Sequence, residues 1–160
     1  MAYDTTSSDG RRDFHFLYGR WAVTHRRLRI RGAGSRDWDE FSGTAFCQGL
    51  MNGLCNVDEN AFSDRADQGL SFRTFDIAQR RWVIYWVSST SGALQAPVIG
   101  RFENGEGRFE GVDVDDGRPV KVVYLWKDIT VDAAHWSQAF SYDDGANWET
   151  NWTMIFARAA

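Results

Sequence analysis

The chain has 160 residues and a formal net charge of -4 at pH 7, so it carries no overall positive field that would attract nucleic acid or an anionic membrane. Its hydrophobic fraction of 43% predicts one folded domain, which at this length buries roughly two thirds of its unfolded surface. Aromatic residues reach 15%, with 8 Trp, and so many indoles predict a large core or a ligand-lined cavity.

The first residues of the chain do not show the sequence pattern of a targeting signal. No apolar run approaches the length of a membrane-spanning helix. Residues 1–12 are polar and are predicted as a flexible leader. They lack the basic and then apolar pattern of a secretory signal peptide. The folded domain is predicted at 13–160, beginning with a short helical turn from Asp13 to Tyr18 that Asp13 could cap. These features predict a cytoplasmic protein.

Turn signals divide the chain into short segments rich in aromatic and β-branched residues. Asn-Gly or Asp-Gly dipeptides, which favour tight hairpins, stand at 52–53, 104–105, 116–117 and 144–145. Ten strands are predicted, at 20–31, 37–48, 54–62, 69–76, 81–89, 96–103, 107–114, 119–127, 134–142 and 147–157. Because twist closes such a series, the sequence predicts an all-β, antiparallel up-and-down meander closed into a barrel.

The two cysteines, Cys47 and Cys55, do not indicate a disulfide framework. A tight turn at 52–53 would place Cys55 opposite Leu50 and Cys47 opposite Asp58. Side chains alternate along a strand, so the two thiols would then point to opposite faces of the sheet. We therefore expect both cysteines to be reduced.

One predicted strand is apolar on both faces, at 82–87, whereas a half-buried strand should alternate. Its outer face therefore needs a cover. We expect that cover to be the N-terminal turn or a second copy of the chain, and the sequence thus raises a homodimer as a prediction.

The first strand opens with Gly19-Arg20-Trp21 after a short helical turn, which resembles the start of calycin barrels, the lipocalin and fatty-acid-binding group. The resemblance implies that Trp21 closes one end of the barrel. It also implies that a basic residue from the last strand, here Arg158, packs over the indole.

Nearly the whole chain resembles a bacterial domain-of-unknown-function family of small calycin-like barrels, of the DUF1579 type. The matching stretches are Gly19 to Trp21 with Val23 and His25, Arg81 to Trp86, Pro97 to Phe102, Trp136, Gln138, Phe140-Ser141, Asp144-Gly145 and Trp148 to Trp152. The resemblance implies a calycin-like barrel with a cavity, and it implies no particular reaction.

Motifs of familiar chemistry are absent from the sequence. It contains no phosphate-cradling glycine loop, no zinc helix, no nucleophile elbow and no paired Cys-x-x-Cys. The histidines His15, His25 and His135 are widely separated, and their spacing does not favour a metal site. We therefore expect no cofactor and no metal.

The last predicted hairpin offers a polar wall. With a two-residue turn at 144–145, one face would carry Trp136, Gln138, Phe140, Glu149 and Asn151, and the other Trp148, Trp152, Met154 and Phe156. If the first face points inward, the cavity holds an amide pair and a carboxylate among aromatic rings, and Glu149 is placed to act as an acid or base. If it meets solvent, Gln138 and Asn151 only bond to each other across the strands.

The first strand carries a basic series. If Trp21 points inward, the two-residue period sends His25 and Arg27 inward as well. His25 would then serve as a proton shuttle and Arg27 as a clamp for a carboxylate or phosphate. The alternative is a solvated basic strand end beyond the core.

Further candidates for ligand contact are polar or aromatic residues in the middle of the chain: Asn56, Asp58, Arg73, Trp86 and Arg101. Buried charges must be paired, so the alternative is that Asp58 or Glu149 neutralises Arg73 or Arg101 structurally. For Trp86 the alternative is an ordinary core position.

The leading hypothesis is that the barrel binds a small, partly aromatic or amphipathic molecule, with an acidic group as one option, and has no nucleic-acid or membrane partner. The first alternative is a cofactor-independent isomerase, cyclase or hydrolase that uses His25 and Glu149 as acid and base. A haem-binding barrel would need His25 or His135 as an axial ligand. A structural dimerising module would have a filled core.

Overall fold

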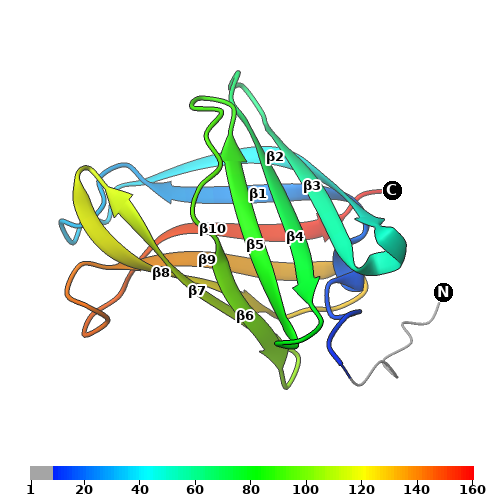
Figure 1. Ribbon diagram of the computed structural model, residues 1–160. Helices are drawn as coiled ribbons and strands as arrows, with labels where there is room; N and C mark the ends of the chain where they lie inside the picture. The colour runs from blue at the N-terminus through cyan, green and yellow to red at the C-terminus, as the bar shows by residue number, and fades with distance from the viewer. Residues whose placement is uncertain (1–8) are drawn as a thin grey trace.

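The computed structural model describes residues 9–160, so residues 1–8 of the predicted leader lie outside the described residues. Ten antiparallel strands close into a barrel (Figure 1). They are β1 (Gly19–Leu28), β2 (Trp38–Leu50), β3 (Cys55–Phe62), β4 (Gln68–Asp76), β5 (Arg81–Ser88), β6 (Val98–Glu103), β7 (Glu106–Asp115), β8 (Arg118–Lys127), β9 (Ala133–Ser141) and β10 (Glu149–Arg158). Each strand pairs with its neighbours in sequence and β10 pairs with β1, which confirms the predicted closed meander.

The tight turns set the register of the hairpins that contain them. Across the β6–β7 turn, Phe102 pairs with Gly107 and Phe109 with Gly100, as predicted. The ring of Phe102 covers Gly107, since a Cβ at that glycine would come within 2.8 Å of a ring carbon. The β2–β3 register is also confirmed, because Leu50 pairs with Cys55 and Cys47 with Asp58. Both cysteines are free.

The β9–β10 hairpin differs from its prediction. The two-residue turn at 144–145 is wrong, because β9 ends at Ser141 and β10 begins at Glu149. The longer loop is organised by Asp143, whose carboxylate accepts hydrogen bonds from Asn147 N over 2.8 Å and from Asn147 Nδ2 over 2.7 Å.

A β-bulge at Asn151 then changes the side to which the rest of β10 points. The register shifts between Thr150 and Trp152, so that Trp152 pairs with Gln138 and Met154 with Trp136. Residues that were predicted for opposite faces of this hairpin therefore lie on the same face. The indole of Trp152 shares the inner wall with the amides of Gln138 and Asn151.

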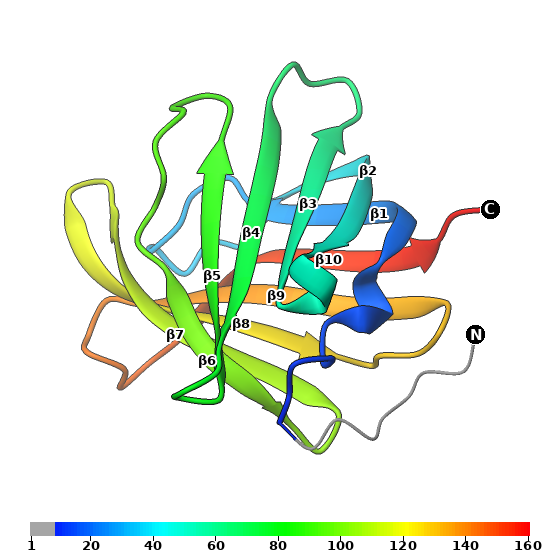
Figure 2. The same cartoon turned by 45° about the vertical axis from the view of Figure 1, so that its right-hand side comes forward.

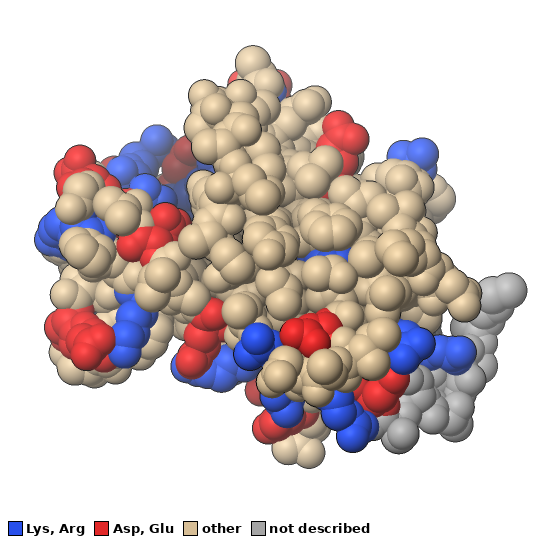
Figure 3. Space-filling model, viewed as in Figure 1, with Lys and Arg blue, Asp and Glu red and all other residues tan. Residues whose placement is uncertain are grey.

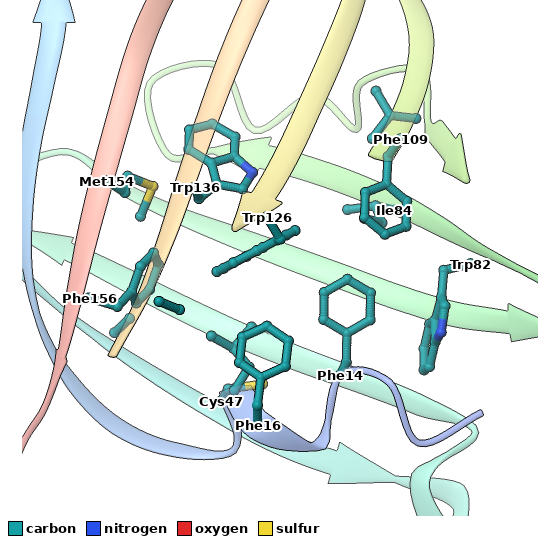
Figure 4. Close-up of a cluster of buried hydrophobic side chains, with 14 of the residues drawn as sticks. Phe14, Phe16, Cys47, Trp82, Ile84, Phe109, Trp126, Trp136, Met154 and Phe156 are labelled. Atoms are coloured by element: carbon teal, nitrogen blue, oxygen red, sulfur yellow. The ribbon is translucent and has the colours of Figure 1, made fainter. Parts of the chain in front are cut away.

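One end of the barrel is filled by aromatic rings. The 3₁₀ turn η1 (His15–Leu17) lies inside this end, and Phe14 packs edge-on against Trp82 (Figure 4). Phe14 also packs edge-on against Phe102, and in both pairs the ring centroids are 5.0 Å apart. The turn has no side-chain cap, so the predicted capping role of Asp13 is wrong. A second turn, η2 (Met51–Gly53), lies at the same end and connects β2 to β3.

Trp21 is buried at this closed end. Its indole N–H donates to the carbonyl of Leu17 over 2.8 Å. The guanidinium of Arg158 lies 3.8 Å from the Trp21 ring centroid and donates to the carbonyl of Phe16 over 2.8 Å. The last strand therefore holds η1 in place through a cation–π contact and backbone carbonyls.

The outer face of the strand at 82–87 is partly exposed, and the N-terminal turn lies inside the barrel instead of over it. In the view of Figure 3, charged side chains gather around the edges and few lie over β4 and β5. The homodimer stays a prediction. No helix in the described part of the chain is long and apolar enough to cross a membrane.

Candidate functional site

The space inside the barrel is divided into two hollows. An inner cavity of about 30 Å³ lies in the middle, and a pocket of about 240 Å³ opens at the end opposite η1. Trp86, Tyr124 and Trp152 line both hollows and so form the partition between them. The inner cavity has room for about one or two water molecules. The barrel is therefore a hollow container only at its mouth.

We call this opening the mouth pocket. Figure 2 shows the loops after β1, β7 and β9 at this end, away from η1 and from the C-terminus. The mouth pocket is lined by Arg27, Leu28, Arg31, Trp86, Gln95, Asp113, Val114, Asp115, Tyr124, Gln138, Phe140, Asn151 and Trp152. Aromatic and polar groups thus alternate around a space that solvent can enter.

An amide pair forms part of the wall. Gln138 Nε2 donates to Asn151 Oδ1 over 2.8 Å. Asn151 is only 2% exposed, and its Nδ2 is buried without an acceptor among the described residues. The structure therefore brings both predicted amides together on the inner wall, with one donor left unpaired.

Arg27 lies at the base of the mouth pocket against aromatic rings. Its guanidinium carbon is 3.8 Å from the Trp152 ring centroid, 4.9 Å from Phe62 and 5.2 Å from Phe41. Burial lowers the pKa of Arg27 to about 10, although the charge of Asp67 acts in the opposite direction. The group still carries its charge at neutral pH, in surroundings that solvate it poorly.

His25, one position deeper on the same inner face of β1, is fully enclosed at 0% exposure. Its Nδ1 accepts a hydrogen bond from Trp152 Nε1 over 3.1 Å, and its ring stacks on Phe41 with centroids 4.8 Å apart. Burial, followed by repulsion from Arg27, lowers the pKa of His25 to about 3. His25 is therefore a neutral, packed histidine, and it does not line the mouth pocket.

Glu149 holds the loop between β1 and β2. Its two carboxylate oxygens accept hydrogen bonds from the backbone N–H of Gly32, over 2.7 Å, and of Gly34, over 3.2 Å. Both glycines have a positive φ, which suits the tight curvature of this loop. The carboxylate thus fastens a loop at the barrel end, and it does not line the mouth pocket.

The same loop crosses the mouth through an ion pair. Arg31 contacts Asp115 at 2.7 Å, and the hydroxyl of Tyr142 donates to the other oxygen of Asp115 over 2.7 Å. Burial, followed by this hydrogen bond, raises the pKa of Tyr142 to about 12. The Arg31–Asp115 ion pair and its hydrogen bond from Tyr142 therefore close one side of the opening.

A polar cluster lies deeper in the barrel. Arg73 is 4% exposed and Asp58 3% exposed. They form an ion pair at 2.9 Å, and Arg73 also donates to Asn56 Oδ1 over 2.9 Å. Asp58 further accepts from the backbone N–H of Ser71 over 3.2 Å. Three predicted contact residues thus meet as a mutually neutralised cluster beside the inner cavity.

The remaining predicted residues are dispersed. Trp86 lines both hollows, and Trp136 lines the inner cavity. Arg101 is exposed on the outer face of β6, so its prediction as a lining residue is wrong. A strand can direct only one of two successive side chains inward, and in β6 that one is Phe102. His135 lies on the outer face of β9, 3.8 Å from Asp128, and does not face the mouth pocket.

Two aromatic residues of the mouth pocket, Tyr124 and Trp152, are not among the candidates for the inner wall from the sequence. An unbroken two-residue period places Trp152 on the other face, and the bulge at Asn151 breaks that period. Tyr124 shares the two-residue period of Val120, Val122 and Trp126, which are buried along β8. Counting that alternation would have identified Tyr124.

No protein-family model matches the chain, and no curated protein matches it significantly, so the family membership that the resemblance implied stays a prediction. Among solved structures, the S-type phycobiliprotein lyase CPES from Guillardia theta is similar, with a TM-score of 0.57 and 9% sequence identity. The match covers 92% of this chain and 90% of that chain. At this identity the likeness establishes the calycin-like barrel fold and not the activity.

Proposed function

We propose that the chain binds a small, partly aromatic or amphipathic molecule in the mouth pocket. The observation that carries this proposal is the 240 Å³ hollow, which combines aromatic walls with an amide donor that has no protein acceptor. Such a mixture of apolar area and a few convergent polar groups is typical of small-molecule sites.

The aromatic and the amide side chains of the mouth pocket favour different parts of a ligand. Trp86, Tyr124 and Trp152 offer flat apolar surface, which favours a ligand with a ring system. The amide pair of Gln138 and Asn151 offers directional hydrogen bonds, which favour a ligand with a polar end. The inner cavity is too small to receive such a ligand, so the molecule rests above the aromatic partition.

The fold is consistent with this proposal, because the calycin-like barrel is shared with a phycobiliprotein lyase. The acid–base and haem alternatives gain no comparable support. His25 lines neither hollow, Glu149 is engaged with loop amides, and His135 lies on the outer surface.

Titration with N-phenyl-1-naphthylamine, a neutral aromatic probe that fluoresces in apolar surroundings, tests the proposal. We expect saturable binding of one probe per chain, with energy transfer from tryptophan. The Trp86→Leu variant should weaken binding by about tenfold, because it removes one wall of the pocket. Trp148→Leu is the matched control, since Trp148 lies in the exposed loop before β10. Non-saturable binding, or equal losses in both variants, contradicts the proposal.

A further inference from the structure

Arg27 and Arg73 both extend into the interior of the barrel, but they have different partners. Arg73 is neutralised by Asp58 and also bonded to Asn56. Arg27 contacts the face of Trp152, and among the described residues it forms no ion pair. The nearby carboxylate of Asp39 pairs instead with Arg29 and Arg65. A poorly hydrated guanidinium without a carboxylate is an energetic cost that an anion from outside would remove.

A second unused donor stands beside the first. Arg27 pairs with Trp152 across the β1–β10 ladder, and Asn151 is the bulge residue directly before Trp152. The Asn151 Nδ2 is buried and has no acceptor, and both side chains line the mouth pocket. A charged donor and a neutral amide donor therefore meet on adjoining strands of one wall.

The acidic groups of the mouth pocket do not cancel this charge. Asp115 is already engaged with Arg31 and Tyr142. Asp113 lies on β7, away from the β1–β10 wall in the barrel order, and accepts a hydrogen bond from the backbone N–H of Val114 over 2.7 Å. Asp67 acts on Arg27 from outside the mouth pocket, and no carboxylate of the described residues forms an ion pair with Arg27.

We propose that the mouth pocket selects an anionic ligand, whose carboxylate or sulfonate group accepts hydrogen bonds from Arg27 and from Asn151 Nδ2. The aromatic or apolar body of the ligand then lies against Trp86 and Tyr124. The inference rests on the proposed function and adds the charge of the ligand to it. Arg27 suits this role because a planar guanidinium presents two parallel N–H donors to an oxyanion.

A matched pair of probes tests the charge separately from the pocket. 1-Anilinonaphthalene-8-sulfonate has the skeleton of N-phenyl-1-naphthylamine and adds one sulfonate. We expect wild-type protein to bind the sulfonate about tenfold more tightly than the neutral probe at low salt. Arg27→Gln should abolish this preference, because the sulfonate loses its charged partner and the ratio of the two affinities falls to about one. Arg26→Gln is the control, because Arg26 is an outward neighbour paired with Glu40 at 3.4 Å.

A second variant addresses the amide. Asn151→Asp keeps an acceptor for Gln138 and replaces the unpaired donor by a carboxylate, so it should weaken the sulfonate more than the neutral probe. Equal affinity of the wild type for both probes, or a sulfonate preference that survives Arg27→Gln, overturns the anionic inference while the pocket proposal stands. Failure of both probes to bind overturns the proposed function and this inference together. The wild-type comparison keeps the test decisive if a variant does not fold.

Discussion

The indole N–H of Trp152 donates to Nδ1 of His25 over 3.1 Å, which links the last strand of the barrel to the first directly beneath the mouth pocket. The bond fixes the orientation of both rings. It also presents the face of Trp152 to Arg27 at 3.8 Å. The base of the pocket is therefore a fixed stack of rings and one cation, prepared before any ligand arrives.

This enclosure of His25 predicts a pH dependence of stability. The pKa of His25 falls from its ordinary 6.5 to about 3 in the folded protein, so between these values the unfolded chain binds a proton that the folded chain excludes. Stability contributed by neutral His25 is complete above pH 6.5 and is lost as the pH falls toward 3. The limiting slope is about 1.4 kcal/mol per pH unit.

Urea unfolding followed by tryptophan fluorescence at pH 7, 6, 5 and 4 measures this effect. His25→Gln keeps an acceptor for Trp152 and removes the titration, so its stability should fall less steeply with acid. His135→Gln, on the outer face, should retain the wild-type slope. Parallel curves for the wild type and His25→Gln would show that His25 is not excluded from protonation by the fold.

The deep ion pair predicts a second, larger effect. Arg73→Met leaves the buried carboxylate of Asp58 without its cation and should cost about 3–5 kcal/mol in the free energy of unfolding. Adding Asp58→Asn should recover much of that loss, because the uncompensated charge disappears. Lys121→Met breaks an exposed pair with Asp144 and should cost less than about 1 kcal/mol. Comparable costs for Arg73→Met and Lys121→Met, measured by denaturant unfolding, would contradict the structure.

The position of Trp86 depends on a glycine in the neighbouring strand. A Cβ at Gly69 would come within 1.9 Å of the Trp86 indole, so the ring lies directly over the glycine. Gly69→Ala should destabilise the protein by roughly 1–3 kcal/mol through this overlap. In a Trp86→Leu background the same substitution should cost far less. A double-mutant cycle measures the coupling, and additive effects would exclude the contact.

The loop across the mouth depends on Glu149. Glu149→Ala removes the acceptors of the Gly32 and Gly34 amides, so hydrogen exchange at these two positions should accelerate by about tenfold. Glu106→Ala, in the exposed β6–β7 hairpin, should leave both rates unchanged. Unaltered exchange in Glu149→Ala would show that other contacts hold the loop.

Much of the barrel follows from local sequence. Asn-Gly and Asp-Gly turns at 104–105 and 116–117 have positive φ at both residues, and their hairpins have the predicted two-residue connections. The inward direction of Arg27 follows from that of Trp21, because β1 keeps its two-residue period without a bulge. Such features depend only on nearby residues.

The site is harder to predict from the sequence, because it depends on packing between segments that are distant in the chain. The bulge at Asn151 adds one residue to β10, and one added residue reverses every side chain that follows. The filled centre depends on Phe14 entering the barrel from outside the sheet. Neither the bulge nor the entry of Phe14 leaves a periodic signal in the sequence. The sequence therefore predicts a single hollow, whereas one half of the barrel interior is packed and the other half is open.

The most direct test of the account is a crystal structure of the protein with 1-anilinonaphthalene-8-sulfonate bound. We predict density for the naphthyl rings between Trp86, Tyr124 and Trp152, with the sulfonate beside Arg27 and Asn151. Density for the probe only on the outer face of the barrel, with the mouth pocket filled by water alone, would contradict the claim that this pocket is the binding site.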